Sequence, residues 1–243
     1  MNQVETVEKM KSLRLLGMLN AFQVSQEMNQ NWTTDEMIAY LIQAEWEYRI
    51  NKKIERHLKS AKFRYQASIE EIDFQHPRNL DRNKIHQLAQ CNYLSKKENI
   101  ILTGPTGVGK SFLASALGNQ ACLKGFKVLY FNISKLFAEI KMSKLNNTYH
   151  RLITRIEKHD LLILDDFGLV PFDIDNRLAL LEIIEDRHGR KSTMISSQLP
   201  VSKWHPILGD PTIADAILDR LVHQAIRIEL EGESLRKKKI KSE

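Results

Sequence analysis

The chain has 243 residues, a length that suits one large α/β domain with a small appendage and is too short for two full enzymes. Its 42% hydrophobic and 27% charged residues, with only 10 Gly and 6 Pro, exclude a collagenous, low-complexity or wholly disordered chain. No apolar run approaches the roughly 20 residues that a membrane-spanning helix needs, and the start of the chain lacks the continuous apolar core of a secretory signal. The two cysteines, Cys91 and Cys122, argue against disulfide stapling and exclude a metal site made of cysteines. We therefore expect a cytoplasmic protein that has no membrane partner.

The positive charge is unevenly distributed along the chain. Lys and Arg number 36 and Asp and Glu number 30, which gives a net charge of +6. Residues 1–76 hold 10 basic and 11 acidic side chains, so the excess positive charge lies in the larger C-terminal part. This balance modestly favours a nucleic-acid partner.

The N-terminal part has the pattern of a small helical domain. Apolar residues recur at steps of about three over residues 4–28, which predicts one helix with a single apolar stripe. Thr33 and Glu36 form a capping-box pattern that predicts the start of a second helix, antiparallel to the first. The apolar stripe of this second helix is Ile38, Ile42, Trp46, Ile50, Ile54 and Leu58.

A boundary follows where this periodicity fades. His76-Pro77 interrupts any helix, and Asp81 then caps a short helix that extends to Cys91. We therefore expect a helical domain over residues 1–66 for DNA or partner binding, a linker over 67–80 and a larger domain over 81–243.

The larger domain alternates short apolar strands with helices. Strands are predicted at residues 99–103, 127–132, 161–164, 193–197 and 225–230, and helices at 110–123, 134–158 and 174–188. Strands that alternate with helices indicate a parallel five-stranded sheet with helices on both faces, an α/β fold.

A phosphate-binding loop follows the first of these strands. The residues Gly104-Pro105-Thr106-Gly107-Val108-Gly109-Lys110-Ser111 fit the pattern G-x-x-x-x-G-K-[ST]. Glycines let the backbone curl so that successive N–H groups face a phosphate, and the following helix N-terminus adds partial positive charge. Lys110 then reaches the β- and γ-phosphates while the Ser111 hydroxyl binds Mg²⁺. A plain glycine-rich turn would not require this strand-to-helix context, so we predict that the chain binds ATP and Mg²⁺.

Two carboxylates end the strand predicted at 161–164. We expect Asp165 to serve the metal and Asp166 to polarise the attacking water. Alone, such a pair would cap a turn, but downstream of a phosphate loop it is typical of P-loop ATPases. The Asn-Lys-x-Asp segment with which GTPases read guanine does not occur in the sequence.

Five segments occur in a fixed order after the phosphate loop: 162–169, 196–200, 209–212, 219–223 and 231–236. Together they resemble the IstB family of transposition helper ATPases. These are AAA+ proteins similar to the helicase loader DnaC and, more distantly, to the initiator DnaA. The resemblance covers nearly the whole chain and implies an ATPase that assembles on target DNA and assists a transposase. A DnaC-type helicase loader is the alternative, because it would share every ATPase residue.

The resemblance also implies three roles in the ATPase cycle. Gln198 would be the sensor of the γ-phosphate, Arg220 the arginine finger inserted into the neighbouring subunit of a homo-oligomer, and Arg236 the second sensor. From the residues alone, Gln198 is a polar strand-end residue for which Ser197 could substitute. Arg220 is likewise a helix arginine that could pair with Asp219 or Asp215, and Arg236 belongs to a basic tail.

Two features depart from many AAA+ ATPases. Asp166 stands where a glutamate is usual, so hydrolysis is expected to be slow or to need a partner. Only 13 residues follow the last predicted strand, too few for a helical lid over the nucleotide. A nucleotide-dependent switch without turnover therefore stays open as a third hypothesis.

Two basic segments are candidates for DNA contact. Residues 49–64 hold seven basic side chains against Glu55, and five of them share one face of the predicted helix: Arg49, Lys52, Lys53, Arg56 and Lys59. The second segment, 134–158, includes Lys141, Lys144, Arg151 and Arg155, and in the resembling clade an insertion here lines the oligomer's pore. Because no base-reading motif is visible, we expect double-stranded DNA to be bound through its backbone regardless of sequence. A solvated helix face is the alternative for the first segment.

Overall fold

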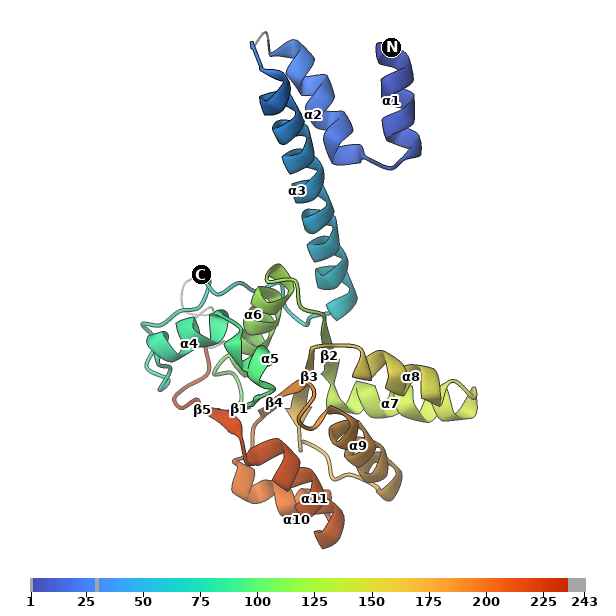
Figure 1. Cartoon of the computed structure of the whole chain (residues 1–243). Coiled ribbons are helices and arrows are strands. Elements are labelled where there is room, and N and C mark those ends of the chain that lie inside the picture. The colour runs from blue at the N-terminus through green and yellow to red at the C-terminus, as the bar shows by residue number, and fades with distance from the viewer. Residues whose placement is uncertain (1, 29–30, 236–243) are drawn as a thin grey trace, which may run out of the picture. The chain divides into compact units, whose positions relative to one another are not determined.

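A computed structural model describes residues 2–28 and 31–235 of the chain (Figure 1). It divides into two compact units, residues 1–56 and 57–243. Over the described residues, no helix combines the length and apolarity needed to cross a bilayer.

The first unit is helical over its described residues. It contains α1 (Gln3–Ser12), α2 (Leu16–Glu27) and most of α3 (Thr34–Ala61), which continues into the second unit. The single helix expected over residues 4–28 is wrong, because Arg14 adopts a positive φ of 56° and ends the first helical run. A left-handed residue turns the chain out of the helix axis, so α2 starts as a separate helix.

The capping box at the start of α3 is confirmed. The Thr33 backbone N–H donates to Glu36 Oε2 at 2.8 Å, and the Glu36 N–H donates to Thr33 Oγ1 at 3.3 Å. The apolar stripe that follows is only partly covered, since Ile38, Ile42 and Trp46 remain 51%, 56% and 59% exposed.

The second unit is a five-stranded parallel sheet between helices, as predicted. The strands lie in the order β2-β3-β4-β1-β5. Their bounds are β1 Asn99–Thr103, β2 Val128–Asn132, β3 Leu161–Phe167, β4 Ser192–Ser197 and β5 Ala225–Glu229. The helices are α4 Arg82–Ala89, α5 Asn92–Lys96, α6 Lys110–Leu123, α7 Ile133–Leu145, α8 Tyr149–Glu157, α9 Ile174–Arg187, α10 Trp204–Leu208 and α11 Pro211–Val222. A 3₁₀ turn, η1, spans Val201–Lys203.

One expected helix of this unit is interrupted. The segment 134–158 forms α7 and α8 rather than one helix, and Asn147 between them has a φ of 53°. Asparagine tolerates the left-handed conformation better than most residues, so it ends the first helix without large strain.

Side chains alternate between the two faces of the sheet. Ile100 and Leu102 of β1 pack with α4, α5 and α6, whereas Ile101 packs with α7 to α11 on the opposite face (Figure 1). All strands run in the same direction, so the residues that follow β1, β3 and β4 meet at one edge of the sheet.

Residues 57–80 belong to the second unit rather than bridging two domains. Ala67, Ile69 and Ile72, expected in a linker, are buried with the apolar residues of α4 and α6. Burial of these side chains removes apolar surface from water, which fixes residues 62–80, a stretch that has no regular helix or strand of its own.

Candidate functional site

The predicted phosphate-binding loop connects β1 to α6. Gly104, Gly107 and Gly109 all have positive φ values, and the Lys110 Nζ donates to the carbonyls of Gly104 at 2.7 Å and Pro105 at 2.8 Å. The loop therefore curls around the lysine ammonium. Burial lowers the pKa of Lys110, although the carboxylates of Asp165 and Asp166 act in the opposite direction.

Segments distant in sequence hold this loop in shape. The backbone N–H of Leu230 donates to Thr103 O at 2.7 Å, and that of Leu235 donates to Gly107 O at 3.0 Å. A Cβ atom at Gly104 would lie 2.1 Å from the Leu230 carbonyl oxygen, so only glycine fits there.

Arg78 stabilises the loop through a hydrogen bond to the loop backbone. Its Nη1 donates to Val108 O at 2.8 Å and its Nη2 to Asp73 O at 2.8 Å, and the residue is 4% exposed. Burial lowers the pKa of Arg78. Sequence reasoning missed this arginine, because it lies in the expected linker and no local pattern relates it to the loop.

The two carboxylates lie at the end of β3, on the same sheet edge. Asp165 is fully buried and accepts a hydrogen bond from the Tyr130 hydroxyl, while the Asn132 Nδ2 donates to Asp166 Oδ2 at 2.8 Å. Burial, together with the charge of Asp165, raises the pKa of Tyr130, so its hydroxyl remains a donor. Asp166 has a φ of 60°, and the β3–β4 pairing shifts register beside it.

The residues fit a magnesium ion. Asp165 Oδ1 is a buried oxygen with no hydrogen-bond partner among the residues that the structure describes. Ser111 follows Lys110 at the start of α6 and lines the same pocket as Asp166. Carboxylate and hydroxyl oxygens are hard ligands of the kind that Mg²⁺ takes beside phosphate.

Gln198, the residue predicted as sensor, lies beside the phosphate-binding loop. It directly follows β4, the strand between β1 and β3, and its Oε1 accepts from Thr106 Oγ1 at 2.6 Å. Ser197, the alternative, is buried and its hydroxyl donates to Phe167 O at 2.8 Å. The structure therefore brings Gln198 to the loop, whereas Ser197 is the last residue of β4 and its hydroxyl is bonded to Phe167.

Arg64 is a second residue that sequence reasoning did not place in the site. In the sequence it is one of the seven basic residues of the 49–64 segment. In the structure its Nη1 lies 3.0 Å from Asp166 Oδ2 and 3.4 Å from Asp165 Oδ2. Because it reaches β3 from about a hundred positions earlier in the chain, no spacing pattern could have found it.

The phosphate loop, Asp166 of β3 and Gln198 after β4 line one pocket of about 520 Å³. This volume is within the range of small-molecule sites. Its walls include Arg64, Tyr65, Arg78, Lys110, Asp166 and Gln198.

Comparison with known proteins assigns the chain to a family. The family model described as IstB-like ATP binding protein matches residues 8–243. The chain belongs to this family. An insertion-sequence ATP-binding protein of Sinorhizobium fredii is 44% identical over 234 residues, with 96% of each chain covered. The ATP-binding protein of insertion sequence IS21 from Pseudomonas aeruginosa is 32% identical over 203 residues, 84% of this chain and 77% of that protein.

Two solved structures share the fold of this IstB-like chain. The DnaC helicase loader matches with a TM-score of 0.57 at 19% identity, over 68% of this chain and 97% of that one. The initiator DnaA bound to AMPPCP and single-stranded DNA matches with a TM-score of 0.61 at 19% identity, over 74% and 56%. At these identities the likeness concerns the fold, an AAA+ P-loop fold.

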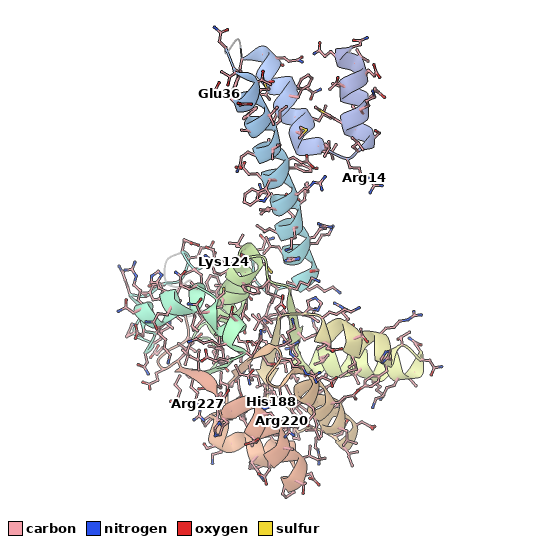
Figure 2. The ribbon with its side chains drawn as sticks, viewed as in Figure 1. Arg14, Glu36, Lys124, His188, Arg220 and Arg227 are labelled. Carbon is pink, nitrogen blue, oxygen red and sulfur yellow. The ribbon has the colours of Figure 1, made fainter. Side chains whose placement is uncertain are left out.

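Arg220 lies at the opposite edge of the IstB-like sheet. Its carbonyl accepts from Asn99 Nδ2 at 3.0 Å, and Asn99 begins β1, whereas the phosphate loop follows the end of that strand. The guanidinium pairs with Glu185 of α9, with Nη2 at 2.8 Å from Oε1, rather than with Asp219 or Asp215. Figure 2 shows Arg220 near His188, with which it lines a separate pocket of about 550 Å³. Arg236 lies outside the described residues.

The basic candidates for DNA contact are mostly exposed in this IstB-like chain. On α3, Arg49, Lys52, Lys53, Arg56 and Lys59 are exposed. Two of these are already paired, since Arg49 Nε lies 2.6 Å from Glu45 Oε1 and Lys52 Nζ lies 2.8 Å from Glu55 Oε2.

The second candidate segment lies on α7 and α8. Lys141, Lys144 and Arg151 are exposed, whereas Arg155 is partly covered and its Nη1 lies 3.3 Å from Glu139 Oε1. Three of the four side chains are therefore accessible from solvent.

Proposed function

We propose that this chain is an ATPase that assembles on target DNA with ATP and assists a transposase during transposition. The observation that carries the proposal is the convergence of Lys110, Asp166 and Gln198 on one pocket from three separate strand ends, with Asp165 buried next to Asp166. The likeness to ATP-binding proteins of insertion sequences supports the transposition context. We further propose that it acts in the cytoplasm, where its DNA and transposase would be found.

The chemistry proposed is hydrolysis of the β–γ phosphate bond. The N–H groups of the loop from Gly104 to Gly109 and the Lys110 ammonium would hold the β- and γ-phosphates. Ser111 and Asp165 would hold Mg²⁺, which supplies neutralisation of the charge that develops on the leaving phosphate. Asp166 would accept the proton of the water that attacks the γ-phosphorus, and Gln198 would orient this water.

Oligomerisation would complete the site. We assign to Arg220 the role of a finger that stabilises the transition state in the neighbouring subunit, which requires it to leave Glu185. Arg236 is assigned as the second sensor by resemblance alone.

DNA would be bound through its phosphates. We assign this role to the basic face of α3 (Arg49, Lys52, Lys53, Arg56 and Lys59) and to Lys141, Lys144, Arg151 and Arg155 on α7 and α8. Residues 1–66 would then be the DNA- or partner-binding part and residues 81–243 the ATPase. Binding would be independent of base sequence.

A replicative helicase loader is the second candidate. The specific observation in its favour is the fold shared with the DnaC helicase loader over 97% of that protein. Pull-down by the purified protein separates the two readings, since a loader would retain a replicative helicase and a transposition protein would retain its transposase. A switch without turnover is the third, and it would release no phosphate even with DNA and partner present.

ATP-dependent assembly on DNA tests the proposal. Lys110→Ala removes the lysine that would reach the β- and γ-phosphates, so the complex formed with ATP and a DNA duplex should disappear in sedimentation or mass photometry. The matched control is Lys124→Ala, an exposed lysine at the other end of α6 (Figure 2), which should assemble like the parent. Equal assembly of Lys110→Ala and the parent would show that the phosphate site is wrongly assigned.

A further inference from the structure

An arginine contacts both acidic residues of the ATPase site. The Arg64 guanidinium nitrogen Nη1 lies 3.0 Å from Asp166 Oδ2 and 3.4 Å from Asp165 Oδ2. Asp165 is fully buried, and the Arg64 side chain is 41% exposed. The positively charged side chain of Arg64 thus faces the carboxylate oxygens that Mg²⁺ and the attacking water would need.

The neighbours of Arg64 hold it in this place. Phe63 packs so closely on α6 that a Cβ atom at Gly118 would lie 2.5 Å from its ring, and it contacts Tyr130 edge-on at 6.3 Å. Tyr65 contacts Phe112 of α6 at 6.3 Å. Two anchored aromatic rings therefore flank the arginine, so its position on the carboxylates follows from packing as well as from charge.

The arginine also comes from a particular place in the chain. It follows the end of α3 by three residues, and Lys62 between them turns the backbone with a φ of 56°. The segment that delivers the cation to the ATPase site therefore belongs to the second unit and begins where α3 ends.

We propose that Arg64 is an internal counter-ion that restrains the ATPase site: it holds Asp165 and Asp166 and must withdraw before they serve Mg²⁺ and the attacking water. This inference rests on the magnesium–nucleotide site proposed above. Two cations cannot share these oxygens without repulsion, so Mg²⁺ binding competes with the arginine. Asp166 Oδ2 also accepts from Asn132, so both acceptor positions of this oxygen are filled, and one becomes available to a water proton when Arg64 withdraws.

The test measures Mg²⁺ competition directly. Binding of a fluorescent ADP analogue is titrated with Mg²⁺ for the parent, Arg64→Gln and Arg64→Lys, and melting temperatures are recorded without nucleotide. Arg64→Gln should need about tenfold less Mg²⁺ for half-maximal binding, because it lacks the competing charge. Without nucleotide it should melt roughly 2–4 °C lower, because two carboxylates lose their counter-ion. Arg64→Lys keeps the charge and should stay near the parent.

The control variant is Lys62→Gln. It removes the same charge from an exposed position two residues away and should change neither measurement. An unchanged or increased Mg²⁺ requirement in Arg64→Gln overturns the inference. A loss of affinity for an ATP analogue but not for ADP would also overturn it, since Arg64 would then be a γ-phosphate ligand. If even the parent binds no nucleotide, the proposed function fails, and the nucleotide-free melting comparison still decides whether Arg64 is a counter-ion.

Discussion

At the scale of single residues, Arg220 lies far from the phosphate loop of its own subunit. It lies near the start of β1, and a five-residue strand spans about 16 Å, so its guanidinium is far from the loop that follows the same strand. The Glu185 carboxylate holds it at the surface, 26% exposed. A neighbouring subunit that presented its nucleotide here would compete with Glu185 for the guanidinium.

Arg220→Ala is therefore expected to keep nucleotide binding by the single subunit and to lose turnover. In the small GTPases, an arginine finger accelerates hydrolysis by about 10³ to 10⁵. Phosphate release with DNA and ATP is the measurement. Mixing Arg220→Ala with Asp165→Asn subunits pairs an intact site with an intact finger, so part of the activity should return.

The matched control for this prediction is Glu185→Gln. It breaks the same ion pair but leaves the arginine, and turnover should persist or increase. If Glu185→Gln lost activity as Arg220→Ala does, and mixing restored nothing, Arg220 would be a structural ion-pair residue.

At the scale of elements, one carboxylate joins α2 to α3. Glu45 of α3 is 7% exposed, and its Oε2 accepts from the backbone N–H groups of Gly17 at 2.9 Å and Met18 at 3.0 Å. These are donors of the first turn of α2, which have no partner within their own helix. Arg49 Nε donates to the other oxygen at 2.6 Å. The contact fixes where α2 begins on α3.

Protonation of Glu45 should weaken the first unit. Burial alone would raise its pKa, but the hydrogen bonds from Arg49, Met18 and Gly17 outweigh it and lower the pKa below the ordinary 4.5. A lowered folded-state pKa means that the stabilisation is complete above about pH 4.5 and is lost as the pH falls through the folded-state value. Glu45→Gln should therefore cost about 2 kcal/mol at neutral pH and flatten the loss of stability in acid.

Chemical unfolding followed by helical circular dichroism between about pH 3 and pH 7 measures this effect. Glu47→Gln, an exposed glutamate on the same helix, is the control and should leave the unfolding midpoint nearly unchanged. A Glu45→Gln protein as stable as the control would remove the capping role.

At the scale of the whole molecule, two basic surfaces share one role in the proposal, the binding of DNA phosphates. The basic face of α3 includes two side chains that already contact carboxylates, whereas three of the four basic candidates on α7 and α8 are exposed. Both surfaces would bind phosphates without reading bases, so affinity for DNA should depend strongly on salt.

The salt dependence assigns the surface. Changing Arg49, Lys52, Arg56 and Lys59 to Gln should reduce the slope of log affinity against log salt by about 3.6 per subunit, at about 0.9 for each phosphate contact. The equivalent variant of Lys141, Lys144, Arg151 and Arg155 is the comparison, measured on unrelated duplexes by fluorescence anisotropy. Retention of both affinity and slope by the α3 variant would make that face merely solvated.

Features that depend only on neighbouring residues are predictable from the sequence. The phosphate loop from Gly104 to Ser111 is predictable because its glycines, lysine and serine lie in one continuous segment and would contact the same phosphate chain. The strand ends at Asp165 and Gln198 followed from apolar runs of the length of a buried strand. The Thr33 capping box likewise closes within four residues, so it needs no distant partner.

Residues whose partners lie far along the chain are found only in the folded structure. Arg64 had the appearance of one more helix-surface cation, but packing of Phe63 and Tyr65 directs it to β3. Arg78 lies in the segment predicted to be a linker, and its acceptor, the Val108 carbonyl oxygen, is 30 positions away in the sequence. The break at Arg14 was hidden because two short helices and one long helix have the same apolar spacing. In each case the deciding contact costs chain entropy that only the assembled core offsets, so no window of neighbouring residues contains it.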